Sequence, residues 1–233
     1  MSELYQHPRV LITGGTSGLG RALVREWRAG GAHVAFVARD EERVLRTSRE
    51  EPGAVGIVGD VSRKDDIYRI ATQALGALGG IDVLVNNASS LGPVPLALLG
   101  DTECEDFEVA LATNLLGPFR LTKALLGALA ASARARTGSV VVNVTSDAAA
   151  TAYAGWGAYS ASKAALLHMS RIWHAELESE HISVLAFDPG DMDTPLHALA
   201  LPDADRATLL QPATSARRLV DLVDAALPRR RVA

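Results

Sequence analysis

The chain has 233 residues, 48% of them hydrophobic, and a formal net charge of -4. This composition supplies a sizeable core and gives no sign of a nucleic-acid partner. A single cysteine, Cys104, excludes an intrachain disulfide, and no apolar run is long enough to span a bilayer. The opening "MSELYQHPRV" lacks the basic and apolar regions of a signal peptide. We therefore expect a soluble, cytoplasmic protein without a metal site.

Six short runs rich in β-branched residues recur along the chain, each ended by Gly, Asn or Asp. Such runs are typical of strands that are buried on both faces of a sheet. They lie at residues 9–14, 33–38, 54–59, 82–87, 139–145 and 182–187. Amphipathic stretches of helical length alternate with them, at 19–29, 40–49, 63–78, 105–131, 157–179 and about 213–227.

Strands that alternate with helices indicate right-handed βαβ units. The sequence therefore predicts an α/β fold of Rossmann type, with a doubly wound parallel sheet of about six strands flanked by helices. No linker rich in Pro, Gly or Ser divides the chain, so we expect a single domain over residues 1–233. The alternative is a doubly wound fold that binds no nucleotide, and the loops must decide between the two.

The loop "TGGTSGLG" at 13–20 joins the first expected strand to the first expected helix. Glycines permit positive φ and a close approach of the backbone to a ligand. The N-terminus of the following helix would direct free N–H groups at a pyrophosphate, and the hydroxyls of the loop add donors. A glycine-rich turn can also be only a tight turn, but its place in a βαβ unit favours a dinucleotide. The candidate residues are Gly14, Thr16, Ser17, Gly18, Leu19 and Gly20.

The spacing of these glycines resembles the T-G-x3-G-x-G motif of the short-chain dehydrogenase/reductase family. The resemblance covers about residues 9 to 195 and implies a Rossmann-fold oxidoreductase with a nicotinamide cofactor. It differs from the more familiar G-x-G-x-x-G fingerprint, so the identification depends on the motifs that follow.

The second expected strand ends in "FVARDEER". An acid at this strand end favours NAD, whereas an arginine accommodates the 2′-phosphate of NADP. Ala38 occupies the position of the acid and Arg39 follows it, with a guanidinium that suits phosphate. Asp40 is a competing ribose ligand, but it precedes a helix, where Asp is a natural N-cap. We therefore expect NADP(H) rather than NAD(H), with Arg39 as the phosphate ligand.

Two further strand ends, "GDVS" at 59–62 and "NNAS" at 86–89, resemble cofactor contacts of the family. The resemblance implies that Asp60 and Val61 meet the adenine and that Asn86 and Ala88 lie against the ribose. Asp and Asn also favour strand ends through turn chemistry alone, which is the structural alternative.

The motif "DPGDMDTP" at 188–195 matches the P-G-x3-T of the family. The resemblance implies that Pro189 and Gly190 turn the backbone beneath the nicotinamide. Met192 is expected at the cofactor, and Thr194 is expected to hydrogen-bond the carboxamide. We expect the two acids of the motif, Asp191 and Asp193, to point to solvent or to cap the next turn.

In "AYSASKAALL" at 158–167, Tyr159 and Lys163 stand four residues apart, in a chain with three lysines and twenty arginines. Residues with this separation share one helix face, so the ammonium can approach the phenol. A free tyrosine has a pKa of about 10, and a nearby positive charge lowers it toward the range useful for proton transfer. The structural alternative is an exposed lysine on a helix.

Ser146 lies thirteen residues before Tyr159, which is the Ser–Tyr–Lys spacing of the family. The resemblance implies that Ser146 holds the carbonyl or alcohol oxygen, that Tyr159 transfers the proton and that Lys163 also grips the nicotinamide ribose. Asn114, in "ATNLLGPF", resembles the asparagine that interrupts a helix in the family and holds a water beside the lysine. Its alternative is an ordinary polar helix residue.

We expect the substrate pocket to be lined by residues 89–99, 147–156 and 191–211, and we call residues 191–211 the lid segment. These segments are mostly apolar and contain one basic residue, Arg206, which disfavours a strongly anionic substrate. Ser146 and Tyr159 should face this pocket. Trp156 could stack on a flat substrate or pack at a helix start. The stretches "AGWGAYSASK" and "NNASSLGP" weakly resemble sepiapterin-reductase-like and benzil-type reductases, which implies a compact apolar ketone or dicarbonyl.

Two classes of function fit these motifs. One is an NADP(H)-dependent oxidoreductase that reduces a carbonyl, and the other is a catalytically silent NADP(H)-sensing or interaction protein on the same fold. A sensor needs the glycine loop but no proton donor, which favours the enzyme. The chain stops at "LPRRRVA", where family members usually add a strand that builds one tetramer interface. We therefore expect a homodimer through the helices at 105–131 and 157–179, rather than a tetramer, and no nucleic-acid or membrane partner.

Overall fold

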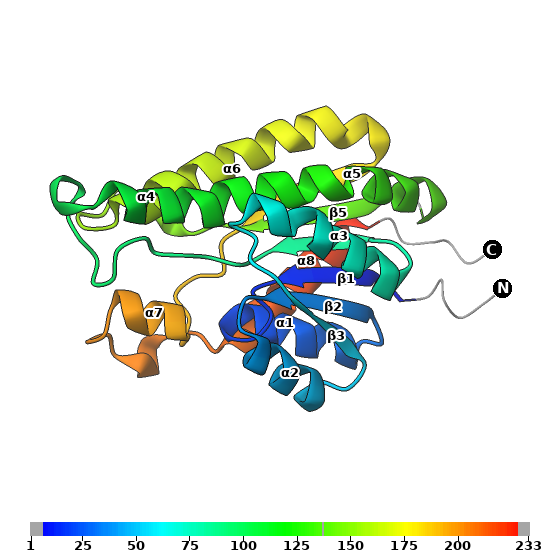
Figure 1. The fold of residues 1–233 in the computed structure, drawn as a ribbon, viewed down its shortest axis with the longest axis horizontal. Helices are drawn as coiled ribbons and strands as arrows, with labels where there is room; N and C mark the ends of the chain where they lie inside the picture. Colours follow the sequence, from blue (N-terminus) through cyan, green and yellow to red (C-terminus); the bar gives the residue numbers. More distant parts are fainter. Residues whose placement is uncertain (1–6, 137, 228–233) are drawn as a thin grey trace.

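The computed structural model describes residues 7–136 and 138–227, and its six parallel strands form one sheet in the order β3-β2-β1-β4-β5-β6 (Figure 1). Every strand ends within one residue of its expected position. The strands are β1 (Arg9–Thr13), β2 (His33–Ala38), β3 (Ala54–Val58), β4 (Val83–Asn86), β5 (Ser139–Val144) and β6 (Ile182–Phe187).

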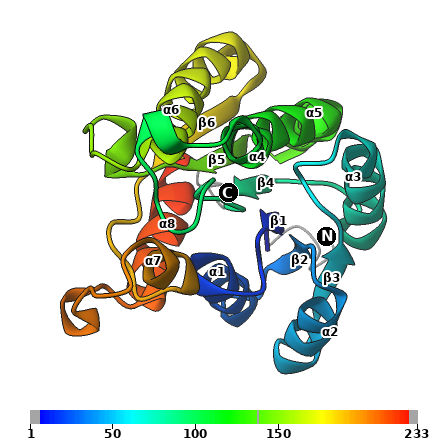
Figure 2. The ribbon, with the colours of Figure 1, turned by 60° about the vertical axis from the view of Figure 1, so that its left-hand side comes forward.

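Helices cover both faces of this sheet (Figure 2). One face carries α1 (Gly18–Ala29), α2 (Glu41–Glu50) and α8 (Pro212–Ala226). The other carries α3 (Lys64–Leu78), α5 (Gly117–Arg136) and α6 (Gly157–Leu177). The Rossmann-type doubly wound fold is thereby confirmed. None of the helices in the described residues has the length and apolar character needed to cross a membrane.

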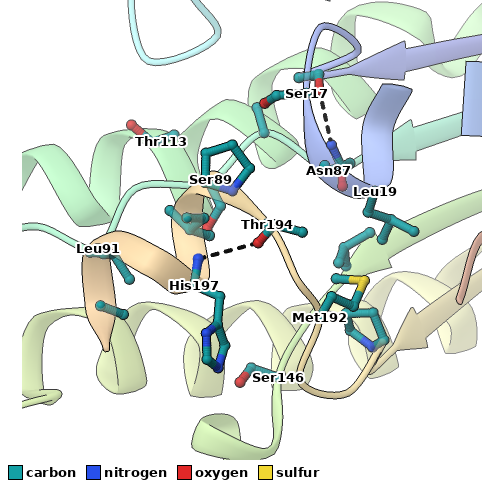
Figure 3. A pocket seen from close by; sticks show the side chains of 18 of the residues that line it. Ser17, Leu19, Asn87, Ser89, Leu91, Thr113, Ser146, Met192, Thr194 and His197 are labelled. Atoms are coloured by element: carbon teal, nitrogen blue, oxygen red, sulfur yellow. Dashed lines mark hydrogen bonds between the residues drawn. The ribbon is translucent and has the colours of Figure 1, made fainter. Parts of the chain in front are cut away.

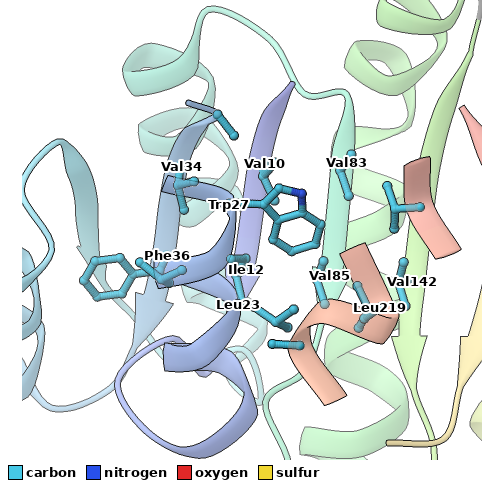
Figure 4. Packing of buried hydrophobic residues seen from close by; sticks show 14 of the residues in the cluster. Val10, Ile12, Leu23, Trp27, Val34, Phe36, Val83, Val85, Val142 and Leu219 are labelled. Atoms are coloured by element: carbon cyan, nitrogen blue, oxygen red, sulfur yellow. The ribbon is translucent and has the colours of Figure 1, made fainter. Parts of the chain in front are cut away.

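The strands alternate between two hydrophobic layers, which explains why they read as continuous apolar runs. In β1, Val10 and Ile12 pack with Leu23 of α1 and Leu219 of α8 (Figure 4). Leu11, between them, packs with the opposite layer formed by α3 and α5. The members of both layers are almost fully buried.

The expected helix at 105–131 is divided in the structure. It consists of α4 (Cys104–Leu111), a π-helical turn (Ala112–Leu116) and α5. Short helices that the sequence analysis did not predict are α7 (Pro195–Ala200) and the 3-10 turns at Leu99–Asp101, Asp147–Ala149, Glu178–Glu180 and Arg206–Thr208. Elements of three to six residues have too little periodicity to be recognised from a hydrophobic pattern.

The order of the strands reverses its direction between β1 and β4. In doubly wound sheets, ligands bind outside the carboxyl ends of the strands at such a reversal. The glycine loop follows β1 and the "NNAS" loop follows β4, so the fold brings both motifs to this position.

Candidate active site

A cavity of about 610 Å³ lies at the carboxyl ends of the strands. The glycine loop, the strand ends, the start of α6 and the lid segment all contribute to its wall (Figure 3). Most of the expected site residues line it: Gly14, Thr16, Ser17, Gly18, Leu19, Arg39, Asp60, Val61, Ala88, Ser146, Trp156, Tyr159, Lys163, Pro189, Gly190, Met192 and Thr194.

Gly20 and Asn86 are expected site residues that do not line the cavity. A Cβ at Gly20 would overlap the carbonyl oxygen of Gly14, so this glycine allows the loop to pack on α1. The side chain of Asn86 is buried in the sheet, where its Nδ2 donates to Asn143 Oδ1 at 2.8 Å and to Thr122 Oγ1 at 3.3 Å. Both residues therefore lie outside the cavity and stabilise the elements that form its wall.

Asn114 also lies behind the wall, in the π-helical turn. Its Oδ1 accepts from the backbone N–H of Ser90 at 2.8 Å, and its Nδ2 donates to Ser90 O at 2.7 Å and to Ser162 Oγ at 2.8 Å. The side chain is buried and engaged in bonds between three chain segments. It interrupts the helix as expected, but it anchors the "NNAS" loop to α6 instead of pointing into the cavity.

The N-terminus of α1 opens into the cavity. Gly14 and Gly18 have φ values of 71° and 49°, which only glycine adopts readily. Ser17 occupies the N-cap position but makes no side-chain cap bond, and the first turn contains no acid. The uncapped N–H groups and the positive end of the helix dipole therefore suit an anionic group such as a pyrophosphate.

Asn87 is a site residue that the sequence analysis missed. Its Nδ2 donates to Thr13 O at 2.9 Å and to Gly14 O at 3.4 Å, and its backbone N–H donates to Thr13 Oγ1 at 2.9 Å (Figure 3). It thereby holds the glycine loop against the end of β4. The only sequence signal was its place as the second Asn of "NNAS".

Two arginines, Arg39 and Arg43, line the cavity beyond β2. Asp40 is the N-cap of α2, because its Oδ1 accepts from the backbone N–H of Arg43 at 3.0 Å, and this expectation is confirmed. Arg39 is exposed and forms no ion pair with another described residue. Ala38 contributes no carboxylate that could compete with an incoming phosphate.

Lys163 is buried deep in the wall. Its Nζ lies 5.5 Å from the centre of the Tyr159 ring and donates to Val144 O at 2.7 Å. Burial lowers the pKa of this ammonium to about 8. An ammonium carries three donors, so two N–H groups remain for a ligand.

Tyr159 is 8% exposed, and burial raises its pKa to about 12. Hydrogen bonds with Ser146 and Ser89 act to lower this pKa, and the negative charges of Asp188 and Asp147 add to the rise. We expected a lowered pKa for Tyr159, but in the protein without a cofactor burial raises it instead. The phenol is protonated at neutral pH and can act as a proton donor.

Trp156 takes one of the two roles that the sequence left open, packing at the start of a helix. It precedes the first residue of α6 and its ring packs edge-on against Tyr159, with the ring centres 5.7 Å apart. It also lines the cavity and contacts the ring of Tyr153 at 6.4 Å.

Asp147, Asp188 and Asp191 also line the cavity. Asp147 and Asp191 belong to the expected pocket segments, whereas Asp188 was not expected there. Among the described wall residues of the three expected pocket segments there is no Arg or Lys. Carboxylates therefore line this part of the cavity together with the Lys163 ammonium.

Two backbone hydrogen bonds join the two ends of the lid segment. The backbone N–H of Asp193 donates to Leu210 O at 2.9 Å, and the N–H of Leu210 donates to Asp191 O at 2.9 Å. The carboxylate of Asp193 lies on the solvent side, as one of the two expectations for it had it, and forms a bidentate ion pair with Arg206 at 2.9 Å for both bonds. The cap of α7 is Thr194, whose Oγ1 accepts from the N–H of His197 at 3.2 Å (Figure 3).

Comparison with known proteins agrees with this geometry. The sequence model described as short chain dehydrogenase matches residues 8–204. L-fucose dehydrogenase of Mus musculus is 32% identical over 209 residues, which cover 89% of this chain and 74% of that protein. The 3-oxoacyl-[acyl-carrier-protein] reductase of Thermotoga maritima is 33% identical over 204 residues, covering 86% of this chain and 80% of that one.

A solved structure shows the same architecture. The 3-ketoacyl-(acyl-carrier-protein) reductase of Brucella melitensis, complexed with NADH, superposes with a TM-score of 0.86 and is 27% identical, covering 94% of this chain and 92% of that one. Because the family model spans most of the chain and the relatives align along nearly all of it, the chain belongs to the short-chain dehydrogenase family of oxidoreductases.

Proposed function

We propose that this protein is an NADP(H)-dependent oxidoreductase that interconverts a carbonyl and an alcohol by hydride transfer. The observation that carries the proposal is the convergence of Ser146, Tyr159 and Lys163 on one cavity whose opposite wall is the open N-terminus of α1. Asn114 completes the set by fixing the loop beside them. A protein that only sensed the cofactor would have no use for a protonated phenol beside the lysine.

The residues present fit a nicotinamide dinucleotide. The glycine loop and the N-terminus of α1 would hold the pyrophosphate, while Asp60, Val61 and Ala88 would contact the adenosine half. Pro189, Gly190, Met192 and Thr194 would hold the nicotinamide, and the Thr194 hydroxyl still has its hydrogen to donate because its oxygen accepts from His197. When bound, the nicotinamide supplies or accepts the hydride at the carbonyl carbon.

The proton of the reaction belongs to Tyr159. In reduction, its phenol gives a proton to the carbonyl oxygen, so that a hydride on carbon and a proton on oxygen together yield the alcohol. The two unused N–H groups of Lys163 would bind the nicotinamide ribose, and its positive charge would stabilise the phenolate that remains. In oxidation the same atoms move in the opposite direction.

The preference for NADP(H) over NAD(H) rests on Arg39 and Arg43. Both line the cavity beyond β2, and Ala38 leaves room for a 2′-phosphate beside them. Related structures contain either cofactor: the Brucella reductase holds NADH and a variant of the actinorhodin polyketide ketoreductase holds NADPH. The preference therefore depends on this chain's own arginines.

The substrate that fits best is a compact ketone or dicarbonyl without an anionic group. Leu91, Trp156, Leu196 and Leu199 give the reacting end of the cavity an apolar surface, and the lid segment would cover it. The negative charges of Asp147 and Asp191 disfavour carboxylates and phosphates here.

We also propose a homodimer through α5 and α6. Phe119 and Trp173 form a ring pair across these helices, with centres 6.1 Å apart, and Leu116, Phe119 and Ile172 are exposed on the same region. Residues 228–233, which bear on the choice between dimer and tetramer, lie outside the described residues. Analytical ultracentrifugation should give twice the chain mass; a monomer at all concentrations would contradict this assembly.

The function is tested by following NADPH and NADH consumption in parallel with diketones, aryl ketones, quinones and 3-oxoacyl thioesters. We expect turnover with NADPH on ketones or dicarbonyls and slower turnover with NADH. Tight binding of NADPH without turnover of any carbonyl or alcohol would favour the silent sensor.

A further inference from the structure

The side chain of Asp147 lies directly beside the Ser146 hydroxyl at the reacting end of the cavity. Its Oδ1 accepts from Ser146 Oγ at 2.9 Å and from the backbone N–H of Ala148 at 2.7 Å. Its Oδ2 accepts from the hydroxyl of Tyr153 at 2.7 Å. The carboxylate is therefore held in place by three donors, one of which is the hydroxyl proposed to bind the substrate oxygen.

The hydrogen between Ser146 and Asp147 can have only one origin. The hydrogen bond from Tyr153, followed by those from Ser146 and Ala148, lowers the pKa of the Asp147 carboxyl, so the group is ionised at neutral pH. An ionised carboxylate only accepts hydrogen bonds, and a serine hydroxyl has a single hydrogen to give. Ser146 therefore donates its hydrogen to Asp147.

This leaves the Ser146 oxygen as an acceptor toward the cavity. It already accepts from the backbone N–H of Ala148 at 3.2 Å, and its other lone pair faces the Tyr159 hydroxyl. When Tyr159 turns to a substrate oxygen, that lone pair becomes available to the ligand. The hydroxyl of an alcohol can donate to that lone pair. The oxygen of a ketone has no hydrogen and would face the same lone pair unless Ser146 turned its O–H away from Asp147.

We propose that Asp147 is a positioning residue that fixes the Ser146 hydroxyl as a hydrogen-bond acceptor, so that the site binds the alcohol directly and the ketone only after Ser146 releases Asp147. This inference rests on the proposed oxidoreductase function. It makes Asp147 a determinant of the relative affinity for the two sides of the reaction, without a role in the transfer of hydride or proton.

Turnover measurements alone would not reveal this role of Asp147. Substitution cannot alter the equilibrium between ketone and alcohol, so kcat/KM must change together in the two directions. The effect of Asp147 appears instead in the dissociation constants of the two ligands. Hydrogen bonds to charged groups are strong enough that their loss changes an affinity ratio about ten-fold or more.

The test uses the holoenzyme with acetophenone and 1-phenylethanol as a ketone and alcohol pair. Acetophenone is bound to the complex of the enzyme with NADP+, and 1-phenylethanol to the complex with NADPH, so that neither ligand can react. The dissociation constant of each ligand is then measured. In Asp147→Ala we expect the ratio of the ketone constant to the alcohol constant to fall about ten-fold. Asp147→Asn retains an acceptor oxygen without the charge and should give an intermediate ratio.

Tyr153→Phe is the matched control, because it removes a hydrogen bond from the same carboxylate and leaves the bond to Ser146 in place. Its ratio should stay close to that of the wild type. An unchanged ratio in Asp147→Ala, or an equal change in Tyr153→Phe, would overturn the positioning role while the wild type still turned over the probes. If the wild type turned over neither probe with either cofactor, the proposed apolar-ketone function would fail first, and this inference with it.

Discussion

The ammonium of Lys163 lies 5.5 Å from the centre of the Tyr159 ring, and both groups are almost completely removed from solvent. Burial shifts the two groups in opposite directions, with the pKa of Lys163 lowered to about 8 and that of Tyr159 raised to about 12. The unliganded protein thus holds a charge that is costly to bury next to a phenol that keeps its proton. Cofactor binding can offset this cost by hydrogen-bonding the ammonium.

Lys163→Met should stabilise the cofactor-free protein at neutral pH. Between pH 8 and 10.5 the unfolded chain holds a proton on Lys163 that the folded protein releases, so the free energy of unfolding of the wild type rises with pH over this window. The wild type should therefore be less stable than Lys163→Met by up to about 3 kcal/mol at pH 7, and the gap should close as the pH rises above 10.5.

Urea denaturation across this pH range measures the gap. Lys123→Met, which removes an exposed ammonium on α5, is the control and should show no comparable dependence on pH. A constant difference between the wild type and Lys163→Met would mean that Lys163 is not buried as a charge.

Tyr159→Phe should abolish turnover and retain the cofactor. The change removes the proton donor but keeps the ring that packs against Trp156. We expect kcat to fall by about 10²- to 10⁴-fold with little change in the dissociation constant of NADPH, measured by fluorescence titration. Tyr68→Phe, on the exposed face of α3, should behave as the wild type. Activity close to normal in Tyr159→Phe would assign the proton to another group.

Arg39→Ala should separate the two cofactors. Loss of a guanidinium from the 2′-phosphate is expected to weaken NADPH binding about ten- to a hundred-fold and to leave NADH binding nearly unchanged. Isothermal titration with both cofactors measures the difference. Arg46→Ala removes an exposed arginine from α2, the helix that follows Arg39, but outside the cavity wall, and it should affect neither cofactor. Equal losses for NADPH and NADH in Arg39→Ala would refute the phosphate contact.

Gly20→Ala should damage the cofactor site through the backbone. The added Cβ would overlap the carbonyl oxygen of Gly14, so the loop must move, at a cost of about 1–3 kcal/mol in stability and a loss of NADPH affinity. Gly76→Ala adds a Cβ to α3 with no atom within 4 Å and should stabilise the protein by about 0.5–1 kcal/mol. Thermal unfolding of both variants provides the comparison, and a stable Gly20→Ala protein with normal NADPH affinity would show that the loop can yield.

Much of this site follows from the sequence because its parts are local. The glycine spacing, the strand ends and the Tyr–Lys separation are set by neighbouring residues, and each is found where its pattern predicts. The hydrogen-bond partners of Asn86 and Asn87 could not be predicted in this way. The two residues are neighbours in one motif, but Asn86 points into the sheet and Asn87 points toward the glycine loop. Which of two adjacent side chains faces a cavity depends on the register of the strand end.

Other features of the site depend on contacts between segments that are distant in the sequence. Arg206 reaches Asp193 because Leu210 pairs with the backbone of the motif at the base of the lid segment, which no local pattern indicates. The pKa of Tyr159 was predicted in the wrong direction for a related reason. The sequence shows that a charge is near the phenol, but only the packed structure shows how far both groups are removed from water.

The central claim is that this protein transfers a hydride from NADPH to a carbonyl carbon. It is tested most directly by incubating the wild type with a ketone and NADPH deuterated at C4, in each of its two stereoisomeric forms, and analysing the alcohol by mass spectrometry. We predict one deuterium at the carbinol carbon from one of the two stereoisomers and none from the other. Bound NADPH without any alcohol product, or an alcohol that carries no deuterium with either form, would contradict the account.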